Sequence, residues 1–269
     1  ENSLTDLWSL ADFAVPGVLG DLSAFQERYP DGIETAREVA EIVGPIMIKR
    51  KVADVADDLP ERIDIDVPLE MEEDLVDHYE DVREATLAQY PVAGALVATL
   101  QLQLVCAHPW LRENKVEIDG GENAVIDPNC GVPLINTKME RALALIDEAF
   151  STGKKVLVFA LFNRMGELLR QAGQDLPDAY WGAINGSTPQ EERQGVIDTF
   201  SDFDGPAILV LNPKAAGAGL NITAATVVIH LTPVWNPALE AQASARAHRR
   251  GQTLPVTIYR LYYEDTIER

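Results

Sequence analysis

The sequence lacks the phosphate-binding loop of a nucleotide hydrolase. No Gly-x-x-x-x-Gly-Lys-Ser/Thr pattern occurs among the 269 residues, and no Asp-Glu-x-His box follows an apolar run. These two motifs supply the amides, the lysine and the carboxylates that hold nucleotide phosphates and magnesium. We therefore expect this chain, taken alone, not to hydrolyse ATP.

Cysteines and long apolar runs are also scarce. The two cysteines, Cys106 and Cys130, exclude the disulfide framework of a small secreted domain. With His108 they offer only three zinc ligands, so we predict no metal site and interpret His108 as a helix-end residue that bonds backbone groups. No apolar run reaches the roughly 18 residues of a membrane span, which predicts a cytoplasmic protein.

Basic residues are few for a protein that binds nucleic acid. The chain has 22 Lys and Arg against 43 Asp and Glu, a formal net charge of −21. A DNA-binding surface is normally basic, so this charge predicts weak DNA binding at most. The acidic residues concentrate in 54–84, where they offer a surface to a protein partner, whereas Arg246, Arg249, Arg250 and Arg260 lie near the end of the chain.

From residue 136 the sequence alternates helical patterns with short, continuous apolar runs. The predicted strands are Val156–Ala160, Tyr180–Ile184, Ala207–Leu211, Val227–Leu231 and Val256–Tyr262. The predicted helices are Lys138–Ser151, Arg164–Ala172, Gln190–Phe203 and Ala238–Ala247. Such an alternation is typical of a parallel sheet with helices on both faces.

The first half of the chain is mainly helical in pattern. The expected helices there lie within 4–22, 23–29, 36–43, 46–55, 70–90 and 92–105. Between them, Ile63, Ile65, Val67 and Leu69 alternate with polar residues, which predicts a half-buried strand. Residues 110–135 are rich in Gly, Asn, Asp and Pro and are expected to form a loop.

The segment Glu240–Gln252 carries two arginines at a chemically suggestive spacing. Arg246 and Arg249 are three residues apart, so in a helix both guanidinium groups project from one face. Planar, permanently charged guanidinium groups suit the charge that develops on a transferring phosphoryl group. The alternative is a basic pair on an ordinary surface helix.

The surrounding residues resemble one family in particular. Lys214–Gln252 is similar to motifs V and VI of the Swi/Snf family of superfamily-two helicase-like ATPases, which move along double-stranded DNA. Lys155–Phe162 resembles motif IV of that family, and Cys106–Pro109 resembles its Cys-Asn-His-Pro box. Residues 1–10 are similar to the segment after motif III, so the resemblance covers nearly the whole chain in family order.

The resemblance implies an α/β fold: a RecA-like three-layer parallel sheet, the second helicase lobe, with an N-terminal helical region. It divides the chain into the tail of the first ATPase lobe and a helical region (1–68), a helical protrusion and loop (69–135) and the second RecA-like lobe (136–269). It also implies that the chain is a piece of a longer protein whose first lobe is its partner and holds most of the ATP and magnesium. Duplex DNA is then the other partner, and the location is the nucleoid.

The same resemblance assigns site residues. Arg246 and Arg249 match arginine fingers, and the expected nucleotide-binding residues are Gly217, Gly219, Gln242 and Gln252. The expected DNA-binding residues are Gly186, Ser187, Thr188, Lys214, Trp235 and Asn236. Simpler alternatives remain open: a glycine turn without a ligand, structural glutamines, Trp235 in a core, and Ser187 or Thr188 as a helix cap. The sequence departs from the family at Ala183, Asn185, Asn212, Pro213, Thr232 and Ala245.

The function implied is that of the C-terminal lobe of an ATP-dependent double-stranded DNA translocase or remodeller. One rival is a non-catalytic interaction module, in which the acidic helical insertion binds a protein partner. Another is an RNA-directed ATPase of the same superfamily, which Trp235-Asn236-Pro237 disfavours.

Overall fold

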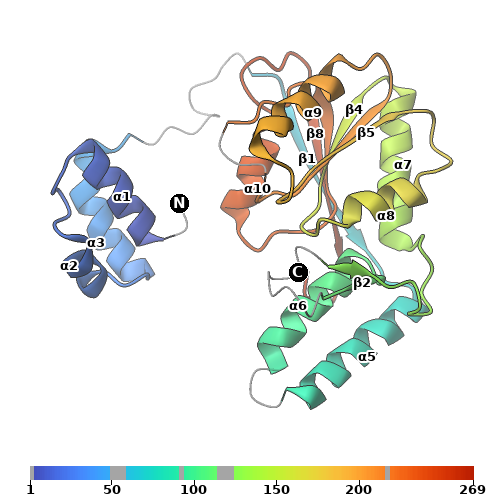
Figure 1. Cartoon of the computed structure of the whole chain (residues 1–269), viewed down its shortest axis with the longest axis horizontal. Coiled ribbons are helices and arrows are strands. Elements are labelled where there is room, and N and C mark those ends of the chain that lie inside the picture. Colours follow the sequence, from blue (N-terminus) through green and yellow to red (C-terminus); the bar gives the residue numbers. More distant parts are fainter. Residues whose placement is uncertain (1–2, 49–58, 91–93, 114–123, 216–218) are drawn as a thin grey trace. The chain divides into compact units, whose positions relative to one another are not determined.

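The computed structural model describes residues 3–48, 59–90, 94–113, 124–215 and 219–269. By their internal contacts these residues form two compact units, Glu1–Asp57 and Asp58–Arg269, which we describe separately. Figure 1 shows the helices of unit 1 and the sheet and helices of unit 2. The predicted domain boundaries after residues 68 and 135 stay predictions.

Unit 1 is a small bundle of α1 (Leu4–Ala14), α2 (Leu22–Arg28) and α3 (Ile33–Val43), followed by the 3₁₀ turn η1 (Gly44–Ile46). Phe25 and Val39 lie in its apolar core. The helices expected near residues 4, 23 and 36 are confirmed. The helix expected over 46–55 is wrong at Met47 and Ile48, because Gly44-Pro45 interrupts the helical hydrogen bonds; its residues 49–55 lie outside the described part.

Unit 2 is built on a parallel sheet of six strands. These are β1 (Arg62–Leu69), β4 (Lys155–Phe159), β5 (Tyr180–Ile184), β6 (Ala207–Leu211), β7 (Ala225–His230) and β8 (Val256–Tyr263). Their order is β1-β8-β7-β4-β6-β5, and every neighbouring pair is parallel. The strands predicted from continuous apolar runs are all present, with ends shifted by at most two residues.

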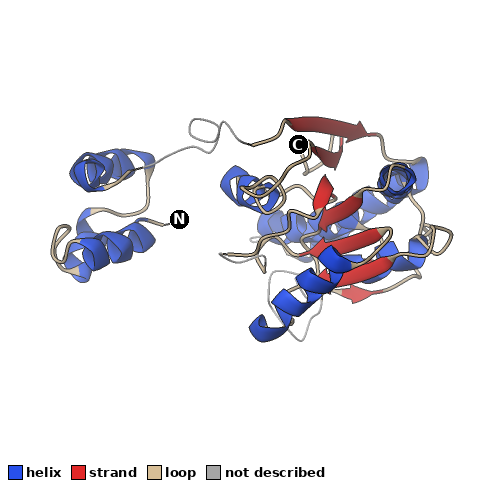
Figure 2. Cartoon of the chain, turned by 90° about the horizontal axis from the view of Figure 1, so that it is seen from above, coloured by secondary structure: helices blue, strands red, loops and turns tan. Residues whose placement is uncertain are grey.

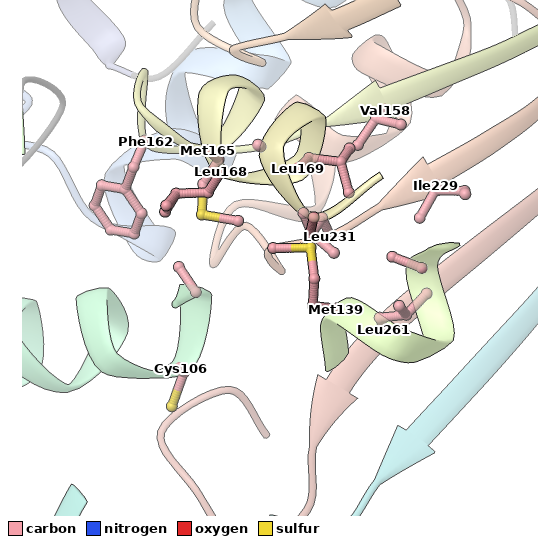
Figure 3. Packing of buried hydrophobic residues seen from close by; sticks show 14 of the residues in the cluster. Cys106, Met139, Val158, Phe162, Met165, Leu168, Leu169, Ile229, Leu231 and Leu261 are labelled. Carbon is pink, nitrogen blue, oxygen red and sulfur yellow. The ribbon is translucent and has the colours of Figure 1, made fainter. Parts of the chain in front are cut away.

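Helices cover both faces of the sheet, as the alternation predicted (Figure 2). The helices of the lobe are α7 (Thr137–Ser151), α8 (Met165–Ala172), α9 (Gln190–Asp202) and α10 (Pro237–Ser244). On one face, Met139 of α7, Leu168 of α8 and Val158 of β4 belong to one buried cluster (Figure 3). On the other face, Phe200 of α9 and Ala243 of α10 belong to a second buried cluster. The result is a three-layer sandwich.

The strand predicted from the alternation at 63–69 is confirmed as β1. Its place in the sheet had not been predicted. β1 lies at the edge of the large sheet, paired in parallel with β8, with Arg62 opposite Val256. Ile63 and Ile65 are 38% and 37% exposed, as expected of an edge strand. Residues far apart in the sequence thus become neighbours.

Two long helices, α5 (Glu73–Gln89) and α6 (Gly94–Ala107), pack against each other and form what we call the helical arm (Figure 1). Glu72 accepts hydrogen bonds from the amide and hydroxyl of Thr137 at the start of α7. Tyr79 of α5 accepts one from the amide of Ile267. The arm is therefore fastened to the lobe.

The loop predicted over 110–135 contains regular structure. β2 (Leu111–Arg112) and β3 (Val125–Ile126) pair antiparallel within it, so the prediction of a plain loop is wrong at these residues. Within the described part of the chain, no helix has the length and apolar character needed to cross a membrane.

Candidate functional site

The segment that carries Arg246 and Arg249 is not helical. α10 ends at Ser244, and residues 245–251 form successive turns, so the prediction of one helical face for both arginines is wrong. The Ser244 hydroxyl is buried and lies 2.8 Å from His230 Nε2. Gly251 then adopts a φ of +99°, a left-handed conformation that favours glycine and reverses the chain before β8.

Gln252 holds these turns in place. Its Nε2 donates to the carbonyls of Thr223, Ala225 and Ala247, and its Oε1 accepts from the amides of Thr253 and Leu254. The side chain is only 5% exposed. These bonds use the whole amide group, so they favour the structural alternative for Gln252 over nucleotide contact.

The two arginines lie near each other without a carboxylate partner. Arg249 Nη1 lies 3.3 Å from the Leu220 carbonyl, and the Arg246 carbonyl accepts from Ile222 N at 2.9 Å. Burial lowers the pKa of Arg246, and the nearby positive charge of Arg249 lowers it further. Among the described residues, neither arginine forms an ion pair, and the buried Arg246 Nε has no hydrogen-bond partner.

The proximity of two positive charges, without a carboxylate partner in the described part of the chain, destabilises this part of the fold. A half-buried guanidinium with an unbonded N–H beside a second positive charge is stabilised by a ligand that brings negative charge. Guanidinium forks match phosphate oxygens in particular. The pair is therefore suited to a phosphate group, without being held by a shared helix face.

Of the predicted nucleotide-binding residues, Gln252 lies beside the arginines in its structural role, and Gly219 also lies there. Gly219 has a φ of +110°, as expected of a glycine turn, and precedes Leu220, whose carbonyl contacts Arg249. Gln242 is exposed on α10. Gly217 lies outside the described residues. The structure thus brings Gly219, Arg246 and Arg249 together where β7 and β8 begin.

The predicted DNA-binding residues lie at the opposite edge of the sheet. Gly186–Thr188 follow β5, Lys214 follows β6, and Trp235 and Asn236 follow β7. Because parallel strands end at the same edge, these loops form one row, which we call the carboxyl rim. A strand of five or six residues separates the rim from the arginines by about 15–20 Å.

The rim loop after β5 is organised by Asn185. Its Oδ1 accepts hydrogen bonds from the backbone amide and the hydroxyl of Ser187. The backbone amide of Asn185 donates to the Thr188 hydroxyl. Pro189 is the cap residue of α9, so the prediction of Ser187 or Thr188 as a plain helix cap is wrong. Arg193 donates to the carbonyls of Thr188 and Ala215 and so ties this loop to the one after β6.

Two departures from the family pattern turn out to brace the rim. Asn212 Nδ2 donates to the Leu161 carbonyl at 2.8 Å, and its Oδ1 accepts from the Lys214 amide at 2.9 Å. The Thr232 hydroxyl accepts from the Leu161 amide at 2.8 Å. From the sequence alone, both residues were recognisable only as departures from the family pattern. A polar residue directly after a buried strand was the available signal.

Trp235 and Asn236 have different surroundings. Trp235 is 62% exposed, so the prediction that it is a core residue is wrong. Asn236 caps α10 by accepting from the Ala238 amide at 2.9 Å. Lys214 is also exposed. The rim therefore presents an aromatic ring and a positive charge to solvent.

His108 has the helix-end role expected of it. Its Nδ1 accepts from the Trp110 amide, so its Nε2 carries the proton that goes to the Leu134 carbonyl. Burial lowers the pKa of His108 to about 4 and raises that of Cys106 to about 12. In the described ranges, no three His, Cys, Asp or Glu side chains group as metal ligands.

Comparisons with known proteins identify the domains that this chain resembles. Residues 137–251 match the family described as "Helicase conserved C-terminal domain", and residues 1–111 match the "SNF2-related domain". The Zorya protein ZorD of Escherichia coli is 31% identical, covering 99% of this chain and 26% of that protein. The DNA excision repair protein CSB of Oryza sativa is 30% identical, covering 100% and 24%. The chain thus spans about a quarter of the length of the curated relatives it matches.

Solved structures share the fold. The Sulfolobus solfataricus SWI2/SNF2 ATPase core in complex with dsDNA is 25% identical, with a TM-score of 0.59 over 99% of this chain and 56% of that chain. The C-terminal part of the Fun30 ATPase domain, at 22% identity, has a TM-score of 0.63 over 78% and 88%. The predicted RecA-like parallel sheet is confirmed.

Proposed function

The chain belongs to the Swi/Snf family of helicase-like ATPases, and we propose that it supplies the second RecA-like lobe of an ATP-driven translocase on double-stranded DNA. Arg246 and Arg249 are its arginine fingers in this proposal. The observation that carries it is the guanidinium pair itself, with Arg246 partly buried, Arg249 exposed beside it and no carboxylate partner among the described residues. Such a pair is stabilised by a phosphate.

In the full-length protein, the first lobe would hold ATP, and bound magnesium would supply positive charge to its phosphates. The fingers approach the transferring phosphoryl group from this lobe and stabilise the negative charge that spreads over its oxygens. The buried Gln252 keeps their turns fixed against the start of β7. Closure of the cleft between the two lobes brings Arg246 and Arg249 to the ATP phosphates, and the cleft opens again after hydrolysis.

The carboxyl rim is the proposed DNA track. Lys214 and Trp235 are exposed there, and the loop Gly186–Thr188 lies in the same row. Lysines, hydroxyls and amides are the groups that contact phosphates in protein–DNA complexes. Support also comes from the Sulfolobus solfataricus relative, whose structure contains dsDNA. Because the rim and the fingers occupy opposite edges of one sheet, movement of the lobe links hydrolysis to stepping.

A non-catalytic interaction module is the second candidate. The acidic, exposed residues of α5, among them Glu73, Asp74 and Asp77, favour a protein partner at the helical arm. Nothing in such a module requires two unneutralised arginines beside a glycine turn. For this reason the translocase is the better proposal, and the arm is an accessory surface.

The proposal is tested by ATP hydrolysis of the full-length protein with duplex DNA, single-stranded DNA or duplex RNA. Duplex DNA is expected to stimulate hydrolysis most, and displacement of a third strand from a DNA triplex is expected to require ATP. Stimulation by RNA alone supports the RNA-directed alternative. Absence of hydrolysis with every nucleic acid supports the interaction module.

A further inference from the structure

The turns that carry the arginines contact a part of the chain that lies far away in sequence. His248 Nε2 lies 2.9 Å from the Pro60 carbonyl, across 188 positions. Since a carbonyl oxygen only accepts, His248 donates this hydrogen bond. The amide of Val256, the first residue of β8, donates to the Glu61 carbonyl at 3.0 Å. The turns are therefore held by residues that lead into β1.

A second connection joins β1 to α10. Arg260 of β8 donates from Nε to Glu240 of α10 and from Nη2 to Asp64 of β1. Its side chain is 25% exposed and that of Glu240 only 17%. One guanidinium thus bonds two carboxylates from two elements, which a lysine cannot do with the same geometry.

The two connections reach the chain before the first arginine and between the two arginines. Glu240 lies in the first turn of α10, before the arginines, and His248 lies between them. Both are bonded, directly or through Arg260, to the short stretch Pro60–Asp64. That stretch follows residues 49–58, which join unit 1 to unit 2 in the sequence.

We propose that Pro60–Asp64 forms a latch that sets the position of the arginine fingers, with His248, Glu240 and Arg260 as positioning residues. The inference rests on the proposed function and adds the regulation of that site. Through His248 and Arg260, the position of β1 sets the position of the turns that hold Arg246 and Arg249.

The first test is amide hydrogen exchange at residues 245–251 of the full-length protein. Arg260→Lys and His248→Leu are expected to raise exchange at these amides, because the first disrupts the bonds to Glu240 and Asp64 and the second removes the bond to Pro60. Arg83→Lys is the matched control, because Arg83 bonds Glu80 within α5 and no residue of the latch. His248→Asn, which keeps a donor, is expected to restore part of the protection.

The second test separates kcat from KM for ATP in the same variants. Misplaced fingers lower kcat by about tenfold or more at nearly constant KM, because positioning errors act on the transition state. Unchanged exchange in Arg260→Lys and His248→Leu overturns the latch. So does unchanged kcat in them while Arg249→Lys lowers it. If Arg249→Lys itself leaves kcat normal, the finger assignment fails, and the exchange data alone decide whether the latch exists.

Discussion

The ammonium group of Lys138 lies 2.6 Å from the carboxylate of Glu268, and both side chains are almost completely buried, at 1% and 5% exposure. Lys138 also donates to the Cys106 carbonyl at 2.8 Å and lies 4.5 Å from the ring centroid of Tyr263. Glu268 accepts from the Tyr263 amide at 2.9 Å. One ion pair thus joins the helical arm, α7 and the end of the described chain.

Replacing Lys138 by Met is expected to lower the free energy of unfolding by about 3–5 kcal/mol, because it leaves the Glu268 carboxylate buried without its partner. Urea unfolding of the chain measures this loss. Arg164→Met is the control, since it breaks the exposed pair with Glu167 and is expected to cost at most about 1 kcal/mol. Equal losses in the two variants contradict the role of the buried pair. Adding Glu268→Leu to Lys138→Met is expected to restore part of the stability.

Two buried histidines make stability depend on pH. Burial lowers the pKa of His108 to about 4, and burial with the nearby charge of Arg260 lowers that of His230 to about 3, both from 6.5. Below pH 6.5, His108 and His230 are therefore protonated in the unfolded chain while they stay neutral in the folded chain, until the pH approaches their lowered pKa values. The free energy of unfolding falls as the pH drops from 6.5 toward these folded values, by at most about 1.4 kcal/mol per pH unit for each histidine.

The difference between variants isolates this effect. With His108→Gln, the slope of the free energy of unfolding between pH 6 and pH 5 is expected to be shallower by about 1 kcal/mol per unit than in the wild type. Urea titrations at both pH values measure it. The slope is the readout because the substitution itself changes stability at every pH. An unchanged slope means that His108 titrates normally in the fold.

The sequence predicts the sheet well where the pattern is local. The run Ala207–Leu211 is fully buried and is found as β6 at its predicted bounds. The partner of β1 was not predictable in this way, because an alternating pattern specifies a half-buried strand but not its neighbour. The pairing depends on contacts such as Arg260 with Asp64, across 196 positions.

The sequence predicted which arginines belong to the candidate site better than it predicted how they are arranged. The motif pointed to Arg246 and Arg249, but helical spacing suggested one helix face. The helix ends earlier because Ser244 is hydrogen-bonded to His230, and the Ala247 carbonyl accepts a hydrogen bond from Gln252. The partners His230 and Gln252 both lie outside the predicted helix. Local propensity gives no signal for such tertiary bonds.

Duplex DNA is expected to bind this acidic chain weakly, through few phosphate contacts, and to lose affinity as the salt concentration rises. Replacing Lys214 by Ala removes one proposed phosphate contact, so the slope of log affinity against log salt is expected to decrease in magnitude by about 0.9. Fluorescence anisotropy at several salt concentrations measures it. Lys154→Ala is the control, since Lys154 is exposed just before β4, at the edge away from the rim. Tight binding that is insensitive to salt contradicts the proposed track.

The 269-residue chain alone is expected to show no ATP hydrolysis above background, with or without duplex DNA. It lacks the phosphate-binding loop and the acidic box that hold nucleotide and magnesium. A coupled assay for released phosphate measures this. Turnover that Arg249→Ala abolishes would show that the chain contains a complete active site.

The most direct measurement is kcat for DNA-stimulated ATP hydrolysis by the full-length protein carrying Arg249→Lys or Arg246→Lys. Lysine keeps the positive charge but not the planar fork, so kcat is expected to fall by about 10³ or more while the affinity for ATP changes little. Arg250→Lys, at the exposed neighbouring position, is the control and is expected to keep near-normal kcat. Near-normal kcat in both Arg249→Lys and Arg246→Lys would contradict the arginine-finger assignment and favour the interaction module.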